Sequence, residues 1–303
     1  MSALTSADIG QDRSARPGTA DASEGRGRFG RVASLLLIAP LGLLLAAVFF
    51  LPIVNFLSRS FIEPQLTLSH YAELFGEPLY LRILLRTMWI ALATTALTLV
   101  LGYPVALLMT RINGVAAAVV SLCVIIPLWT SVLVRSYAWI VLLQRNGLVN
   151  QSLQHLGIID QPLTLLHTDG AVLVAMTQVL LPFMVLPVYA TLRNIPPELT
   201  RAARNLGAGR LRAFLAVTLP LSLPGAAAGA VMIFVLALGF YITPALVGGP
   251  RTLMIATLIS QQATELSNWP LAAALSFVLL VLSLGVTMAF KRLLGVDRMV
   301  HHG

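Results

Sequence analysis

The residue types that usually carry chemistry are scarce in this sequence. A phosphate-binding loop needs Gly-x-x-x-x-Gly-Lys-Ser/Thr, with its lysine on the phosphates, and the one lysine here, Lys291, is followed by Arg292. The single Cys123 excludes an internal disulfide and a cysteine-based metal cluster. We therefore expect no metal site, no cofactor and no enzymatic activity in this chain. If ATP drives its function, another chain must hydrolyse it.

The composition indicates a membrane protein. Of the 303 residues, 57% are apolar and only 11% are charged, whereas a soluble domain carries about 25% charged residues. The formal net charge is +8. In a soluble protein this excess would suggest nucleic acid, but in a membrane protein basic residues collect in cytoplasmic loops. We expect membrane lipid, and no nucleic acid, around this chain.

Six uncharged windows are long enough to cross a bilayer, which takes about 20 residues in a helix. An arginine in mid-membrane costs about 2.5–3.5 kcal/mol, so Arg82 and Arg86 should precede the second window. Residues 136–143 are apolar but too few to cross, and should form a short interfacial or re-entrant helix between Arg135 and Arg145. The predicted spans are 33–57, 87–110, 115–134, 170–192, 223–247 and 269–290.

The distribution of basic residues predicts the orientation. Fourteen of the 20 Lys and Arg residues fall in the two tails and the even-numbered loops, and six fall on the other side, while the acidic residues divide evenly. Both termini should therefore be cytoplasmic. We expect a disordered cytoplasmic tail over 1–32, a membrane domain over 33–290 and a cytoplasmic tail over 291–303. The first span is too long for a signal sequence and should remain as an anchor.

The loop at 195–220 should present two short helices to the cytoplasm. Pro196 and Pro197 suit a first helical turn, Gly207 can take the left-handed conformation that ends a helix, and a second stretch, 210–219, precedes Pro220. An apolar face recurs at helical spacing, and it could dock a partner or pack back on the protein's own spans or the membrane. That face consists of Leu199, Ala202, Ala203 and Leu206.

This loop resembles the EAA signature of bacterial ABC importer permeases: Glu-Ala-Ala, three residues, Gly, nine residues, then Ile-x-Leu-Pro. The spacing matches at every step, with Arg201 in the place of the signature's glutamate and Glu198 one turn earlier. The resemblance implies an all-α, six-span type I importer permease, whose coupling loop docks into an ATPase. The matching residues are Arg201, Ala202, Ala203, Gly207, Val217, Leu219 and Pro220.

Further segments resemble the spermidine/putrescine branch of these permeases. They lie at 127–140, 146–148, 238–250 and 268–270. The resemblance implies that the chain forms half of a transmembrane path for a polyamine. It also implies three kinds of partner: a cytoplasmic ABC ATPase dimer, a second homologous permease subunit and a periplasmic solute-binding protein, all at the bacterial inner membrane.

A polyamine in such a path would need carboxylates or aromatic faces. The candidates near the outer mouth are Tyr137, Trp139, Tyr241, Thr243 and Glu265. The aromatic residues would also suit an interfacial belt, and Glu265 would suit a solvated loop. Other solutes, such as amino-acid derivatives or ferric iron, remain open. An ion-coupled secondary carrier would need acidic residues within its spans, and the windows contain none.

Overall fold

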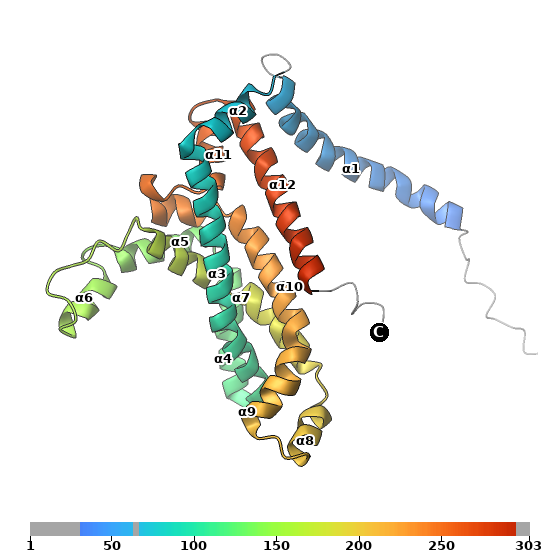
Figure 1. Cartoon of the computed structure of the whole chain (residues 1–303), viewed down its shortest axis with the longest axis vertical. Coiled ribbons are helices and arrows are strands. Elements are labelled where there is room, and N and C mark those ends of the chain that lie inside the picture. Colours follow the sequence, from blue (N-terminus) through green and yellow to red (C-terminus); the bar gives the residue numbers. More distant parts are fainter. Residues whose placement is uncertain (1–30, 63–66, 295–303) are drawn as a thin grey trace, which may run out of the picture. The chain divides into compact units, whose positions relative to one another are not determined.

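The computed structural model describes residues 31–62 and 67–294, and these residues form helices and connecting turns without a β-strand. The predicted N-terminal tail lies outside the described residues except for residues 31–32, which begin α1. Residues 291–294 of the predicted C-terminal tail still belong to α12, and the rest of that tail lies outside the described residues. The α-helices, labelled in Figure 1, are α1 Arg31–Ile62, α2 Ser69–Gly76, α3 Pro78–Arg111, α4 Gly114–Trp129, α5 Val132–Leu143, α6 Leu148–His155, α7 Asp169–Arg193, α8 Pro197–Asn205, α9 Arg210–Ala213, α10 Leu219–Leu238, α11 Ile255–Thr264 and α12 Trp269–Leu294.

The chain divides into two compact units, Met1–Ile53 and Val54–Gly303. Helix α1 begins in the first unit and ends in the second. Its segment Ala39–Ile62 is long and apolar enough to cross a membrane, in agreement with the first predicted span. All helices from α2 onward belong to the second unit.

Five helices of the described chain pass the test for a membrane span, and a bent pair can supply a sixth. The pair consists of α4 and the following segment Val132–His155, which turns by 105° at residues 130–131. The polytopic all-α architecture predicted from the sequence is therefore confirmed. The third predicted window, however, is not one straight helix, because α4 ends at Trp129 and α5 already begins at Val132.

The fifth predicted window is displaced along the chain. A continuous helical stretch runs from Arg210 to Leu238, so it begins before residue 223 and ends well before 247. Gly239 stops α10, and Pro244–Gly248 then forms a separate π-helical turn, labelled η2. Glycine and proline both disfavour the interior of a helix, and the window test, which counts charge alone, does not detect them.

Helices α3, α7 and α10 form the centre of the second unit, and they lie side by side in Figure 1. Small residues bring α10 close to α7. A Cβ atom added to Gly225 would lie 2.2 Å from Thr191 Oγ1 and 2.6 Å from the Pro187 carbonyl oxygen. One added to Gly102 of α3 would lie 3.1 Å from Met184 Cγ. This close helix packing through small residues is typical of membrane bundles, and it holds the loops at both ends in fixed positions.

Candidate functional site

The loop between α7 and α10 forms a helix, a sharp turn and a second helix, as predicted. Pro197 begins α8, where its missing N–H costs nothing. Gly207 has φ +87°, a conformation that other residues adopt only with strain. The N–H groups of Leu206 and Ala208 donate to the carbonyls of Ala202 and Ala203 at 3.1 Å each. These bonds satisfy carbonyl groups at the end of α8 and fix the direction of the turn.

The second helix differs from the prediction, because it does not stop before Pro220. Helix α9 continues through the π turn η1, Phe214–Thr218, directly into α10. A single π turn inside an α-helix is a bulge that widens the helix locally without ending it. Val217 therefore lies in the π turn, while Leu219 and Pro220 occupy the first turn of α10. The loop at 195–220 is thus a direct extension of a helix long enough to span the membrane.

The apolar face of α8 is only partly covered by the chain's own helices. No residue of α8 is buried in the part of the chain that the structure describes. Leu199 keeps 44% of its surface exposed, and Leu206, just beyond the helix, keeps 89% exposed. Ala203 of this face is half-buried, and α8 contacts η1, so the face packs in part on the chain's own helix. Its two leucines remain free for a partner or the membrane surface.

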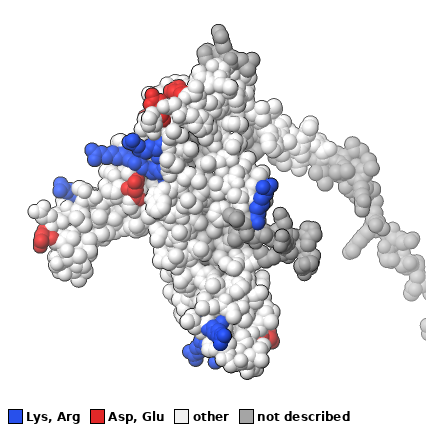
Figure 2. Space-filling view, viewed as in Figure 1, with Lys and Arg blue, Asp and Glu red and all other residues white. Residues whose placement is uncertain are grey.

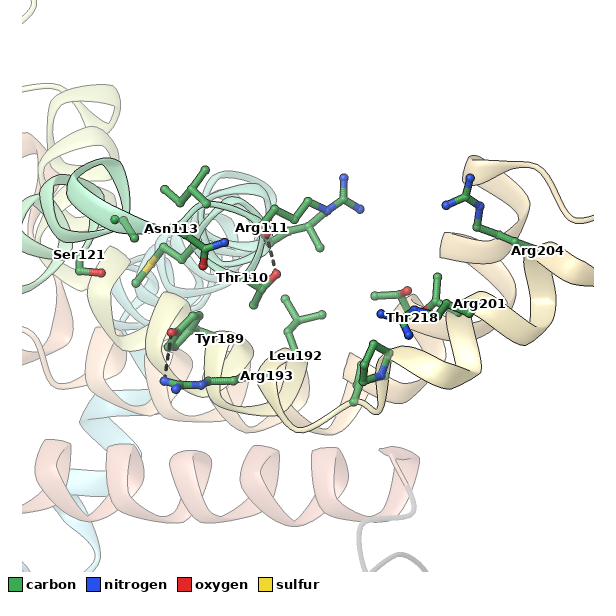
Figure 3. Close-up of a pocket in the computed structure, with 18 residues that line it drawn as sticks. Thr110, Arg111, Asn113, Ser121, Tyr189, Leu192, Arg193, Arg201, Arg204 and Thr218 are labelled. Carbon is green, nitrogen blue, oxygen red and sulfur yellow. Dashed lines mark hydrogen bonds between the residues drawn. The ribbon is translucent and has the colours of Figure 1, made fainter.

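A hollow of about 690 Å³ lies beside α8, between the end of α3, the start of α4 and the end of α7. Arg111 and Arg204 reach into it from opposite sides in Figure 3. Arg201 and Arg193 also line it, and Arg193 Nη1 donates to Tyr189 Oη at 3.4 Å. The lining contains four arginines and no acidic residue among the described side chains. Glu198 is exposed on α8 and does not line the hollow.

The opposite end of the bundle has a different charge pattern. There Arg86 Nε lies 3.6 Å from Asp169 Oδ1, and Arg86 Nη1 donates to the Arg251 carbonyl at 2.5 Å. Figure 2 shows blue and red atoms mixed at this end, and a mainly blue group at the end that bears α8 and α9. The basic excess is therefore concentrated at the α8 end of the molecule.

The predicted path residues occupy two segments that contact each other and one that lies apart. Tyr137 and Trp139 belong to α5, while Tyr241 and Thr243 follow α10. Ser136 Oγ lies 2.9 Å from Thr243 Oγ1, and this hydrogen bond joins the two segments. Glu265 is exposed just after α11.

Each of these side chains has a different degree of exposure. Tyr137 and Tyr241 keep 57% and 45% of their surface exposed. Trp139 is half-buried, and its Nε1 donates to Gln178 Oε1 at 3.4 Å. Thr243 is fully buried. In this conformation its hydroxyl is hydrogen-bonded to Ser136 and does not face an open path.

Arg135 is the functional candidate that sequence reasoning missed. The sequence places it just beyond the third span, but its Nη1 donates to the Val179 carbonyl of α7 at 3.3 Å. Val179 is ten residues into the 25-residue helix α7, which is about 15 Å along its axis. A sequence signal did exist, since Pro127 and the polar pair Thr130–Ser131 precede this arginine and mark the break that turns it inward.

Comparison with known proteins agrees with this architecture. Residues 98–294 match the family described as the binding-protein-dependent transport system inner membrane component. The spermidine/putrescine transport system permease protein PotB of Escherichia coli is 35% identical over 230 residues, which cover 75% of this chain and 83% of PotB. The inner membrane ABC transporter permease protein YdcU of the same organism is 36% identical over 282 residues, covering 86% of this chain and 89% of YdcU.

A solved structure shares the fold. It is a bacterial ABC transporter involved in the import of the acidic polysaccharide alginate, and a chain of it superposes with a TM-score of 0.70 at 20% identity. The match covers 86% of this chain and 95% of that chain. The family match covers well over half of the sequence, and it includes the coupling loop and all helices from the middle of α3 onward. The chain therefore belongs to the family of inner-membrane permease components of binding-protein-dependent ABC transport systems.

Proposed function

We propose that this chain forms half of the transmembrane path of an importer for polyamines such as putrescine and spermidine. The resemblance to PotB, whose name assigns it to spermidine/putrescine transport, carries the choice of solute. A second homologous permease subunit supplies the other half of the path, and a periplasmic solute-binding protein delivers the solute. An ion-coupled carrier is not favoured, because the family transports with the help of a binding protein.

The coupling loop carries the proposed link to energy. A cytoplasmic ABC ATPase dimer binds and hydrolyses ATP, and this chain itself needs no cofactor. Helix α8 has no buried residue, and beyond the turn at 206–209 the helix α9 continues through η1 into α10. A displacement of α8 is therefore transmitted directly to a membrane-spanning helix.

The four arginines beside α8 favour a particular kind of ATPase surface. Arg111, Arg193, Arg201 and Arg204 surround one hollow without an acidic neighbour in its lining. Like charges so close together repel one another unless anions balance them. An ATPase surface with acidic residues opposite this hollow would provide that balance, and Arg201 would contribute to docking where the family signature has a glutamate.

The same charge distribution supports the orientation. Basic residues concentrated at the α8 end favour a cytoplasmic position for that end. Both termini then lie in the cytoplasm, and the segment with Tyr137, Trp139 and Tyr241 lies toward the periplasm, with Thr243 at the joint behind it. Membrane lipid surrounds the exposed apolar surfaces of the spans.

Site-specific cross-linking tests the docking of α8. A photoreactive residue at Leu206 should cross-link to the ATPase in the assembled transporter, because this side chain is almost fully exposed at the tip of the loop. The same residue at Leu266, which is 65% exposed between α11 and α12, is the matched control and should cross-link to the binding protein instead. Contact of Leu266, and not Leu206, with the ATPase would contradict the proposal.

Uptake measurements test the solute separately. Cells that contain the complete system should accumulate labelled putrescine and spermidine, and loss of this chain should abolish the accumulation. The purified binding protein should bind the same two amines. If it binds neither, the permease assignment stands and the proposed solute is wrong.

A further inference from the structure

Arg135 has an incomplete set of partners. One of its five N–H donors is used at the Val179 carbonyl. Its Nε is buried and has no hydrogen-bond partner, and no ion pair within 4 Å joins Arg135 to an acidic residue in the described part of the chain. A donor of a charged group that lacks its partner is costly when it is buried. The Nη2 group also has no hydrogen-bond partner among the described residues but, unlike Nε, is not enclosed, so it is the donor that an additional acceptor can reach.

Arg135 also lies deep in the helix bundle, where a charged group without enough hydrogen-bond partners is more costly. Its contact with Val179 places the charged group near the middle of the 25-residue helix α7. Ionisable residues at such a depth face the interior of a bundle or a water-filled cavity, and they pair with one another or with backbone carbonyls. Arg135 has one such carbonyl, that of Val179, for one of its donors. Arg135 cannot simply withdraw, because the neighbouring Ser136 is fully buried and bonded to Thr243.

Arg135 lines a hollow of about 550 Å³. Its lining combines Arg135 with three aromatic side chains, Trp129, Phe183 and Phe240. Ser131, the N-cap residue of α5, and Val132, its first residue, also line it. The amino end of a helix favours an anion, so the helix end and the arginine give the hollow the same electrostatic preference. The remaining lining residues are Leu128, Thr130, Val179, Leu180 and Leu236.

We propose that this hollow binds a carboxylate, held by the guanidinium of Arg135 at the bend between α4 and α5. A carboxylate offers two oxygens in the geometry that a guanidinium matches with paired N–H donors. The carboxylate comes either from a side chain of the second permease subunit or from a solute in transit. In both cases a simple polyamine, which carries only positive charge, does not itself occupy this position. The proposal goes beyond the assignment as a permease. If the solute is putrescine or spermidine, the second subunit is the source of the carboxylate; a solute source requires that the system also carries a carboxylate-bearing amine.

Chemical modification of the unmutated transporter tests the solute as the source. The assembled complex in lipid nanodiscs is treated with phenylglyoxal, which reacts with arginine, and modification of Arg135 and Arg145 is followed by peptide mass spectrometry. γ-Aminobutyrate and putrescine have the same four-carbon chain and differ in one end group. If the solute supplies the carboxylate, γ-aminobutyrate slows the modification of Arg135 several-fold and putrescine does not. Arg145, exposed beyond α5, is the internal control and should react at one rate throughout.

Charge reversal tests the second subunit as the source. Arg135→Glu should lower uptake about tenfold or more, as expected when a buried charge loses its partner. Arg145→Glu should leave uptake within about twofold, as for an exposed charge. If the second subunit supplies the carboxylate, selection for restored uptake should yield changes of an Asp or Glu of that subunit to Lys or Arg. The membrane level of each variant is checked by immunoblotting.

The modification experiment and the charge-reversal experiment together test whether the hollow binds a carboxylate. Protection by γ-aminobutyrate assigns the carboxylate to the solute, and charge-swap suppressors assign it to the second subunit. If the modification rate of Arg135 is unaffected by γ-aminobutyrate and no charge-swap suppressor of Arg135→Glu arises, the hollow binds no carboxylate, and Arg135 only ties α5 to α7. Loss of folding in the Glu variant does not affect the first arm, because that arm uses the native chain.

Discussion

At the scale of single residues, conformation matters more than reactive chemistry in this protein. Gly207 allows the turn between α8 and α9, since its φ of +87° suits glycine. A Cβ atom at this position would meet nothing within 4 Å. The requirement for glycine is therefore a property of the backbone, and a substitution can strain the coupling loop without disturbing the packing of the helices.

We expect Gly207→Val to uncouple ATP hydrolysis from transport. Valine in the left-handed conformation costs roughly 1–2 kcal/mol, which should change the direction of the turn. The measurement is ATPase activity stimulated by the loaded binding protein in the reconstituted transporter. Gly209→Val is the matched control, because Gly209 has φ −62° and also has open space around its Cβ position. Normal stimulation in the Gly207 variant would count against the coupling role.

Two exposed residues test the proposed entrance to the path. Tyr241→Ala and Glu265→Ala should each weaken uptake while leaving assembly of the complex intact, because both side chains are exposed and support no core contact. Uptake kinetics with labelled putrescine, together with co-purification of the subunits, provide the measurement. Thr243→Ala should behave differently and lower the stability of the complex, since Thr243 is buried against Ser136. Unchanged transport in the first two variants would remove them from the path.

At the scale of elements, the packing of α7 against α10 depends on the absence of side chains. Gly225 lies so close to Thr191 and Pro187 that a methyl group cannot be added without displacement of a helix. Gly285, in α12, has no atom within 4 Å of its Cβ position. The two glycines therefore have opposite roles although both lie in long apolar helices.

We expect Gly225→Ala to destabilise the protein by about 1–3 kcal/mol, the usual cost of overpacking. Gly285→Ala should be neutral or stabilise the helix by about 0.5–1 kcal/mol, because alanine loses less conformational entropy. Thermal unfolding of the purified protein in detergent measures both changes. Equal stability of the two variants would show that α7 and α10 are not in the close contact described above.

Elements with a strong local signal were predictable from the sequence, and those set by tertiary contacts were not. The long uncharged runs depend on local composition, and the turn after α8 depends on one residue, Gly207. Both could therefore be predicted from the sequence. The bend at residues 130–131 and the early end of α10 depend on glycine, proline and polar residues inside apolar windows, which the charge criterion ignores. The inward position of Arg135 depends on α7, which lies more than 30 residues away in sequence.

At the scale of the whole molecule, the distribution of charge should decide how the chain sits in the membrane. Four arginines surround the hollow beside α8, whereas acidic and basic residues are mixed near Asp169 and Arg86 at the other end. Positive residues are retained on the cytoplasmic side during insertion. The α8 end should therefore be accessible from inside the cell, and the turn between α11 and α12 should be accessible from outside.

Cysteine labelling tests this orientation. In a Cys123→Ser background, which removes the one native cysteine, and in cells that lack the ATPase, so that docking does not cover the loop, Leu206→Cys should react with a membrane-impermeant maleimide only in inside-out vesicles. Leu266→Cys should react only in intact spheroplasts. Both side chains are well exposed, so reactivity reports the side of the membrane and not burial. The reverse pattern would place the coupling loop outside the cell, where no ATPase could reach it, and would overturn the proposed mechanism while leaving the helix packing unaffected.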